Sequence, residues 1–309
     1  MNKSILIFAF VAIFAVGCAQ GDADTGAADA AYIAEIEEWR VGRLDRLKAV
    51  DGYLNLAGLF WLSDITSRFG SAEDNDLVFP PPAAAHIGEF EMTNEGIQMT
   101  VFPGGDVRLD GEQVESILMH DDTTETPVTV SSGSLAWVVI YREGKIGVRL
   151  RDFNHPALAA LPPIPHFDID ANWRVEGVLK LFDEPRIMNV GTVIEGVGYN
   201  PESPGVVAFE IDGESYELEA YTSGERLFFV FGDRSSGRDT YGAGRFVYAA
   251  RPGEDGKTVL DFNKSYNPPC AFGDFSTCPV ASPQNRLPIR VEAGEKYEPA
   301  LHVGSLTSH

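Results

Sequence analysis

The sequence predicts a mainly β protein, in which an N-terminal helix is followed by a β-sandwich-like half packed on a second antiparallel β half. Two observations lead to this fold class. Short runs rich in β-branched and aromatic residues alternate with turn pairs such as Gly104-Gly105, Asp110-Gly111 and Asp212-Gly213, which is typical of hairpins. Helical spacing of apolar residues, in contrast, is confined to the start of the folded part.

The expected helix spans residues 31–50. Its apolar positions recur every three or four residues with charges between them, as in a helix that packs on a core by one face. These positions are Ile33, Ile36, Leu44 and Leu47. Asp51-Gly52 is a turn pair and is expected to end the helix.

The rest of the N-terminal half, which runs to residue 155, is expected to consist of short strands. Many short strands with turns at close intervals favour a sandwich. The expected strands are 56–62, 77–79, 89–93, 97–102, 107–109, 126–130, 136–142 and 146–150.

Prolines 156, 162, 163 and 165 mark a stiff crossing into the C-terminal half, residues 156–309. Antiparallel strands are expected again after the crossing. They are 173–182, 186–194, 206–211, 215–220, 226–231, 245–250, 258–262 and 289–291.

Part of the N-terminal half resembles a forkhead-associated domain, a β-sandwich that binds phosphothreonine. The resemblance rests on Phe69-Gly70-Ser71, Asn75-Asp76-Leu77-Val78 and His86-Ile87-Gly88. That family has an Arg where this chain has Ser71, and a Ser where it has Ala83-Ala84-Ala85. The resemblance therefore implies the fold and not phosphothreonine binding.

Residues 1–17 have the pattern of an export signal. Lys3 precedes an apolar run from Ile5 to Val16, which is shorter than the roughly 20 residues of a membrane-spanning helix. Ala15-Val16-Gly17-Cys18 resembles a bacterial lipobox, which implies that Cys18 carries acyl chains such as palmitate. The protein is then expected in the cell envelope, anchored to the outer membrane or to the extracytoplasmic face of the plasma membrane. The alternative is an ordinary cleaved signal peptide with an incidental Cys.

Residues 18–30, rich in Gly, Ala and Asp, are expected to form a flexible tether after the lipidated Cys18. The chain as a whole is acidic: 46 Asp and Glu against 24 Lys and Arg give a formal charge of −22. Because phosphate backbones require a basic face, nucleic acid is excluded as a partner. The expected membrane contact is through the lipid.

Cys270 and Cys278 remain once Cys18 is assigned to the anchor. An even pair in an exported protein is most often a disulfide. A metal site or a reactive thiol pair are the alternatives. Neither a cofactor nor a metal is expected, since the six His residues are scattered and no His lies near the two cysteines in sequence.

An unusual density of polar and turn residues lies between Phe231 and Leu287. Asp261 and Asn263 point to one face of a strand, with Phe262 on the other. Asp233 and Arg245 are expected at the same end of the sheet. The candidate catalytic residues are Asp233, Asp261 and Arg245, and the candidate ligand-binding residues are Tyr241, Arg245, Asp261, Asn263, Tyr266, Asn267 and Asn285. The alternative is an architectural role, in which Arg245 pairs with Asp261 to hold a loop.

Several strings in the chain resemble the bacterial family known as domain of unknown function 1684. They include Tyr-Gly-x-Gly-Arg-Phe at 241–246 and Asp-Phe-Asn-x-x-Tyr-Asn-Pro-Pro-Cys at 261–270. Trp39-Arg40, residues 58–62, 147–149 and 151–152 extend the resemblance over nearly the whole chain. It implies one compact unit and no particular chemistry.

Three functions are consistent with these features. The first is a cell-envelope lipoprotein that binds a small polar ligand or glycan. The second is an extracytoplasmic hydrolase with Asp233 or Asp261 as general base and Arg245 steadying negative charge. The third is a structural envelope protein. Whether the protein is an enzyme is left open.

Overall fold

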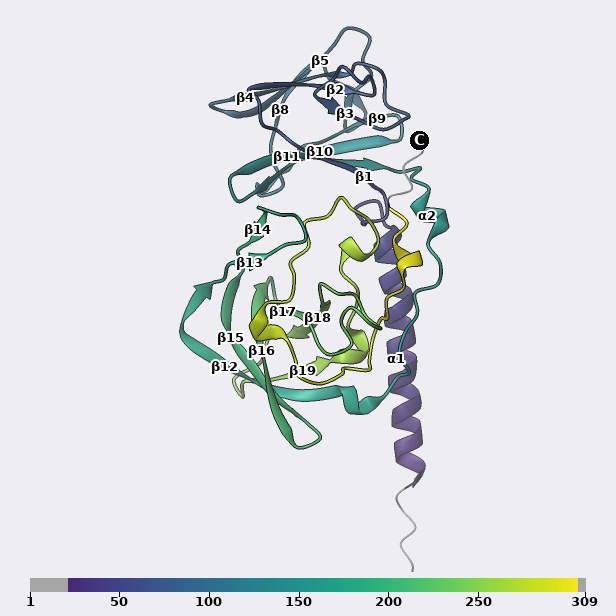
Figure 1. Ribbon diagram of the computed structural model, residues 1–309, viewed down its shortest axis with the longest axis vertical. Helices are drawn as coiled ribbons and strands as arrows, with labels where there is room; N and C mark the ends of the chain where they lie inside the picture. Colours follow the sequence, from purple (N-terminus) through teal and green to yellow (C-terminus); the bar gives the residue numbers. More distant parts are fainter. Residues whose placement is uncertain (1–21, 305–309) are drawn as a thin grey trace, which may run out of the picture.

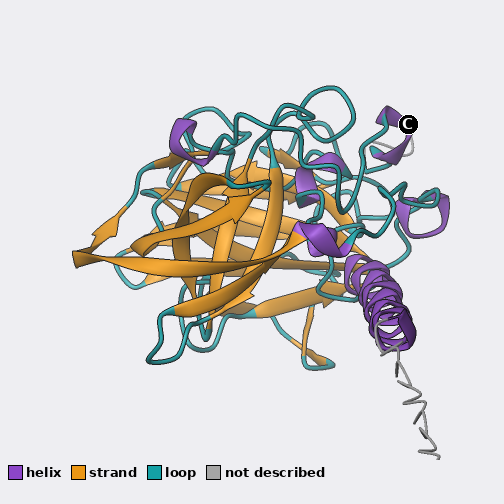
Figure 2. Ribbon diagram, turned by 90° about the horizontal axis from the view of Figure 1, so that it is seen from below, coloured by secondary structure: helices purple, strands orange, loops and turns teal. Residues whose placement is uncertain are grey.

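The computed structural model describes residues 22–304 and is mainly β, as predicted. The predicted export signal and Cys18 lie outside the described residues. Helix α1 (Asp22–Lys48) runs along one side of the strands (Figures 1 and 2). No helix among the described residues is long and apolar enough to cross a membrane.

Helix α1 begins at Asp22 rather than at residue 31, so it extends into the segment that was expected to be a flexible tether. That segment is rich in Ala, which has the highest helix propensity. The helix ends where predicted, because the Gly52 amide donates to the Ala49 carbonyl (2.8 Å) and closes a turn. On the buried face, Ile36 and Leu47 are inaccessible to solvent.

Two mostly antiparallel sheets follow α1 and enclose one core (Figure 1). The first has the order β1 (Leu56–Trp61), β11 (Lys145–Asp152), β10 (Leu135–Arg142), β9 (Thr129–Ser132), β6 (Arg108–Leu109), β7 (Glu112–Gln113). The second has the order β3 (Leu77–Val78), β2 (Thr66–Gly70), β4 (Gly88–Thr93), β5 (Gly96–Val101), β8 (Ser116–Met119). Trp137 packs edge-on against Phe69 and Phe79 between them, which makes this half a sandwich.

The second half is built on one six-stranded sheet. Its order is β18 (Arg245–Ala250), β17 (Arg226–Phe231), β16 (Glu214–Ser223), β15 (Glu202–Ile211), β12 (Arg174–Ile187), β19 (Lys257–Asp261). Thr258 Oγ1 donates to the Ala250 carbonyl (2.7 Å), so the first and last strands of this order meet and the sheet curls round its own core. A small pair, β13 (Val190–Gly191) and β14 (Gly198–Tyr199), lies toward the first half.

The crossing between the halves contains the four-residue helix α2 (Ala157–Ala160) and the extended segment 161–169. Leu47 and Leu54 pack with Ala157, Phe272 and Leu301, so the end of α1 shares one apolar cluster with the crossing and the C-terminal loops. Through this cluster, α1 is fixed against the second half and lies beside the crossing segment.

Most of the expected strands are present. The strand expected at 289–291 was wrong, since these residues are irregular in the structure. The residues around Val291 do not pair with a neighbouring strand. The side chains of Asp233 and Arg245 bind their backbone instead. Asp233 Oδ2 accepts the Val291 amide (3.0 Å), and Arg245 Nη2 donates to the Val291 carbonyl (2.9 Å). Strands β2, β7, β8 and β14 were not expected, and each is short or carries charged residues.

Candidate functional site

Asp233 and Arg245 form a buried ion pair that holds the chain together internally. Arg245 Nη2 donates to Asp233 Oδ2 at 2.8 Å, and both side chains are 1% exposed. Arg245 also donates to the carbonyls of Val291 and Ala293, and Asp233 Oδ1 accepts the Ser235 amide (2.7 Å). Since these groups satisfy one another, the pair anchors the irregular segment near Val291 and presents no free polar atom to a ligand.

The direction of Arg245 follows from the alternation of side chains along β18. Val247 and Ala249, two and four residues on, belong to the core of the curled sheet, and the Arg245 guanidinium lies 5.2 Å from the Phe231 ring at the end of that core. Side chains two apart point to one face of a strand. Arg245 therefore lies on the inner face of the sheet.

Asp261 ends β19, whereas Asn263 lies in the 3-10 helix Phe262–Lys264, so the two do not alternate along one strand as expected; both nevertheless contact Tyr32 of α1. Tyr32 Oη donates to Asp261 Oδ1 (2.8 Å), and Asn263 Nδ2 donates to Tyr32 Oη (3.0 Å) and to the Asp170 carbonyl (2.8 Å). No hydrogen bond or ion pair among the described residues joins this group to Arg245. The expected convergence of four polar residues is thus replaced by two separate networks on opposite faces of the sheet.

Burial raises the pKa of the Asp261 carboxyl above its ordinary value, against the opposing effects of Tyr32 and Lys264. Its Oδ2 has no hydrogen-bond partner, and Lys264 Nζ lies 3.8 Å away. The folded protein therefore holds a proton on Asp261 more tightly than the unfolded chain does.

This shift predicts how stability depends on pH. For a carboxyl whose folded pKa is raised, the contribution to stability is fully present below the unfolded pKa of about 4 and is lost as the pH rises through the folded pKa. We expect Asp261→Asn to gain stability relative to the native protein between about pH 4 and about pH 7. Urea unfolding of both proteins across this range measures it; a difference that is constant, or that shrinks toward neutral pH, would contradict the assignment.

The other predicted ligand-binding residues also serve internal contacts. Asn285 bridges the amide (2.8 Å) and carbonyl (3.0 Å) of Glu219, and Asn267 Nδ2 donates to the Lys296 carbonyl (2.8 Å). Tyr241 Oη donates to the Cys270 carbonyl (3.1 Å). Tyr266 packs among aromatic rings and under Arg43, whose guanidinium lies 4.5 Å from the ring centre.

Cys270 and Cys278 are free, buried thiols, so the expected disulfide is absent from the structure. The Cys270 amide donates to Cys278 Sγ at 3.2 Å, and the Tyr241 hydroxyl is bound to the Cys270 carbonyl. Hydrogen bonds therefore order the loop that a disulfide was expected to close. The residues that the structure describes contain no cluster of His, Cys, Asp and Glu that could hold a metal ion.

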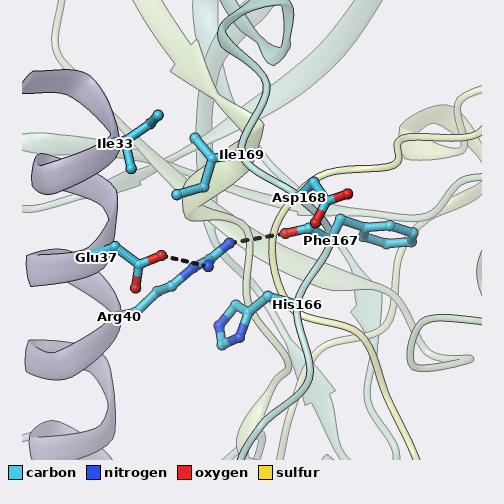
Figure 3. A pocket seen from close by; sticks show the side chains of 7 residues that line it. All are labelled: Ile33, Glu37, Arg40, His166, Phe167, Asp168 and Ile169. Carbon is cyan, nitrogen blue, oxygen red and sulfur yellow. Dashed lines mark hydrogen bonds and ion pairs between the residues drawn. The ribbon is translucent and has the colours of Figure 1, made fainter. Parts of the chain in front are cut away.

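Two cavities lie between α1 and the crossing segment 161–169 (Figure 3). The cavities, of about 460 and 420 Å³, both have Glu37, Arg40 and His166 in their walls. We call this pair of cavities the α1 groove. The first is lined by Ile33, Glu37, Arg40, His166, Phe167, Asp168 and Ile169, and the second extends past Arg43 and Leu44 to Leu161–Ile164 and Glu295.

Arg40 spans the groove. Its Nη1 donates to Glu37 Oε1 (3.1 Å) on α1 and its Nη2 to the Phe167 carbonyl (3.0 Å) on the crossing segment, while Nε is shielded and unpartnered (Figure 3). Burial, reinforced by the positive charge of Arg40, lowers the pKa of His166 to about 4. His166 is therefore a neutral imidazole at physiological pH, able to donate and to accept a hydrogen bond.

The floor of the groove is formed by Arg43 and Glu295. Arg43 Nε donates to Glu295 Oε1 (3.3 Å), its Nη2 donates to the Asn267 carbonyl (2.9 Å), and Glu295 Oε2 accepts the Asn267 amide (2.7 Å). Burial raises the pKa of the Glu295 carboxyl, although Arg43 opposes the rise. The groove thus combines apolar ends with charged and neutral polar groups, which is a lining that can hold a polar molecule.

Sequence reasoning found some members of the groove but not the groove itself. Trp39-Arg40 is part of the resemblance to the DUF1684 family, and His166 directly follows Pro165 of the crossing. Arg40 and His166 are 126 positions apart, and no local pattern links them. The sequence feature that could have indicated the α1 groove is the proline-rich crossing, because a long ordered connection is more often functional than a short one.

Comparison with known protein families gives a match to part of this chain. Residues 159–296 match the model of a family described as Protein of unknown function (DUF1684). The chain resembles DUF1684 over this segment. The DUF1684 match includes His166, Asp233, Arg245, Asp261 and Glu295, whereas α1 and the strings at 58–62 and 147–152 lie outside it. The match is thus narrower than the nearly complete coverage that was expected.

Two solved structures are similar to parts of the chain. An uncharacterised protein of Haloarcula marismortui is 29% identical over 44% of this chain and 82% of that chain, with a TM-score of 0.37. The FHA-2 domain of an ABC transporter of Mycobacterium tuberculosis is 24% identical over 28% of this chain and 77% of that chain, with a TM-score of 0.23. No curated protein matches the chain.

Proposed function

We propose that the protein is an envelope lipoprotein that binds a small polar ligand or glycan fragment in the α1 groove. The observation that carries the proposal is the pair of adjacent cavities with Arg40, Glu37 and His166 in a shared wall. Their volumes fall in the range of small-molecule sites, roughly 300–1,000 Å³.

The chemistry of the lining favours an uncharged or zwitterionic polar molecule such as a sugar. Ile33 and Ile169 give the apolar contact that the faces of a sugar ring require, and Glu37 and Asp168 accept hydrogen bonds from hydroxyl groups. Arg40 and neutral His166 supply donors without a large excess of either charge.

The envelope location is supported by the sequence. The basic start, the apolar run and the lipobox-like residues before Cys18 are the features of an exported and lipidated chain. The molecules that can reach the groove are then those of the envelope, which include sugars and their acidic derivatives.

Arg40 provides the test. In a thermal-shift screen of neutral and acidic sugars, we expect at least one to raise the unfolding temperature of the native protein. Arg40→Met is expected to weaken the affinity for that sugar by about tenfold or more, because a hydrogen bond to a charged group contributes about 1.5–3 kcal/mol.

Arg46 offers a matched control, since it lies on the exposed face of the same helix and lines neither cavity. Arg46→Met is expected to bind like the native protein. Equal binding by native and Arg40→Met proteins, or binding lost equally in both variants, would remove the groove from the proposal.

The two alternative functions have less support. A hydrolase with Asp233 or Asp261 as general base needs a carboxylate that reaches a substrate, and neither residue lines the α1 groove. A purely structural envelope protein leaves the polar lining of the groove without a role.

A further inference from the structure

Arg149 is a largely buried arginine on the outer face of the first sheet, far from the α1 groove in sequence and fold. It lies on β11 opposite Leu59 of β1 and Val138 of β10. Its neighbours Val148 and Leu150 point the other way, into the core of the sandwich. Arg149 therefore faces the C-terminal half, which lies on that side of β1, β11 and β10 (Figure 1).

Within residues 22–304, no hydrogen bond or ion pair engages the Arg149 guanidinium, and its Nε is shielded from solvent without a partner. The neighbouring arginines differ. Arg142 binds both carboxylate oxygens of Asp122 at 2.9 and 2.6 Å. Arg151, two residues along the same face, donates to the Gly52 carbonyl and to Asn55 Oδ1 (2.6 Å). Arg149 is thus a cation whose donors are unused.

The surroundings of Arg149 concentrate positive charge. Burial lowers the pKa of its guanidinium, the charges of Arg142 and Arg151 lower it further, and Tyr53 and Asp122 oppose this fall. Asp122, a nearby acid, is already committed to Arg142. An arginine without an acidic partner is unusual in a chain with 46 acidic and 24 basic residues.

The charge of Arg149 acts on Cys278, which belongs to the C-terminal half. Burial acts to raise the pKa of the Cys278 thiol, but hydrogen bonds to Cys270 and Ser276 and the charge of Arg149 leave that pKa below its ordinary value. At the turn between β10 and β11, Glu143 accepts the Gly198 amide (2.6 Å), which ties the same sheet to β14. Arg149 therefore lies where the two halves meet.

Nε of Arg149 is shielded from water without a partner, and a bound anion would give the unused donors of this guanidinium charge-assisted hydrogen bonds. We propose that Arg149 binds a small oxyanion at the outer face of β11, on the side turned toward the C-terminal half, with Arg151 adding positive charge two residues away on the same face. The planar fork of Arg149 suits two oxygens of one phosphate or carboxylate group. This site is independent of the proposed sugar site.

The test uses the full-length protein in detergent and inorganic phosphate as the probe, with acetate as a carboxylate probe, at constant ionic strength. We expect phosphate, acetate or both to raise the unfolding temperature with saturation. Arg149→Met is expected to lose this response, with affinity reduced by about tenfold or more, and Arg149→Lys to retain part of it. Arg108→Met, which removes an exposed arginine from the same sheet, is expected to respond like the native protein.

Three outcomes would overturn the proposal. One is a native protein that shows no saturable response to either anion. Another is an equal response in native and Arg149→Met proteins, which would place the anion elsewhere. The third is a response that appears only in Cys278→Ser, because Cys278 would then be an internal thiolate that already neutralises Arg149.

Discussion

Replacing Arg245 by Met is expected to lower the free energy of unfolding by about 4 kcal/mol, as is found when one member of a buried ion pair is removed. The substitution leaves the Asp233 carboxylate buried with no positive charge beside it. It also removes the donors to the carbonyls of Val291 and Ala293, so the segment that Arg245 anchors is released. Urea unfolding monitored by circular dichroism measures the loss.

Two further variants make this prediction specific. Arg251→Met removes an exposed arginine just beyond the same strand and is expected to cost less than about 1 kcal/mol. Adding Asp233→Leu to Arg245→Met is expected to recover part of the loss, because no unpaired charge then remains. A cost below about 1 kcal/mol for Arg245→Met would show that the pair is not architectural.

Arg43→Met is expected to destabilise the protein by about 3 kcal/mol at neutral pH and by less in acid. Arg43 gives the fully buried Glu295 its ion pair, and without it the carboxylate has the Asn267 amide as its remaining hydrogen-bond donor. Burial already raises the pKa of Glu295, and removing Arg43 raises it further. The stability linked to this carboxyl is present below the unfolded pKa of about 4.3 and is lost as the pH rises through the folded pKa.

Unfolding free energies of Arg43→Met and the native protein at about pH 4 and about pH 8 check this prediction. Adding Glu295→Gln to Arg43→Met is expected to abolish the pH dependence of the difference, since no carboxyl then titrates. A loss that grows toward acid pH would contradict the role of Glu295 as the buried partner.

The strands could largely be predicted because their signals are local. Runs of β-branched and aromatic residues marked strands such as 245–250, and turn pairs such as Asp212-Gly213 marked the hairpins. The helix start could not be placed, because an Ala-rich segment has no apolar period and its propensity alone does not separate a helix from a tether.

The site was harder, because it depends on faces and long-range contacts. Asp233 follows β17, Arg245 begins β18 and Asp261 ends β19, but period-two alternation does not say which face is buried when both sides are covered. Arg245 points into the core and Asp261 toward Tyr32 of α1. The α1 groove joins residues near 40 to residues near 166, and that proximity exists only after folding.

Hydrogen–deuterium exchange tests the α1 groove most directly, measured with and without the sugar that raises the unfolding temperature in the screen. We expect added protection of amides in residues 33–43 and 161–169, and its loss in Arg40→Met. Protection confined to residues 233–245 and 261–267, with the groove unchanged, would contradict the assignment of the ligand site to the α1 groove.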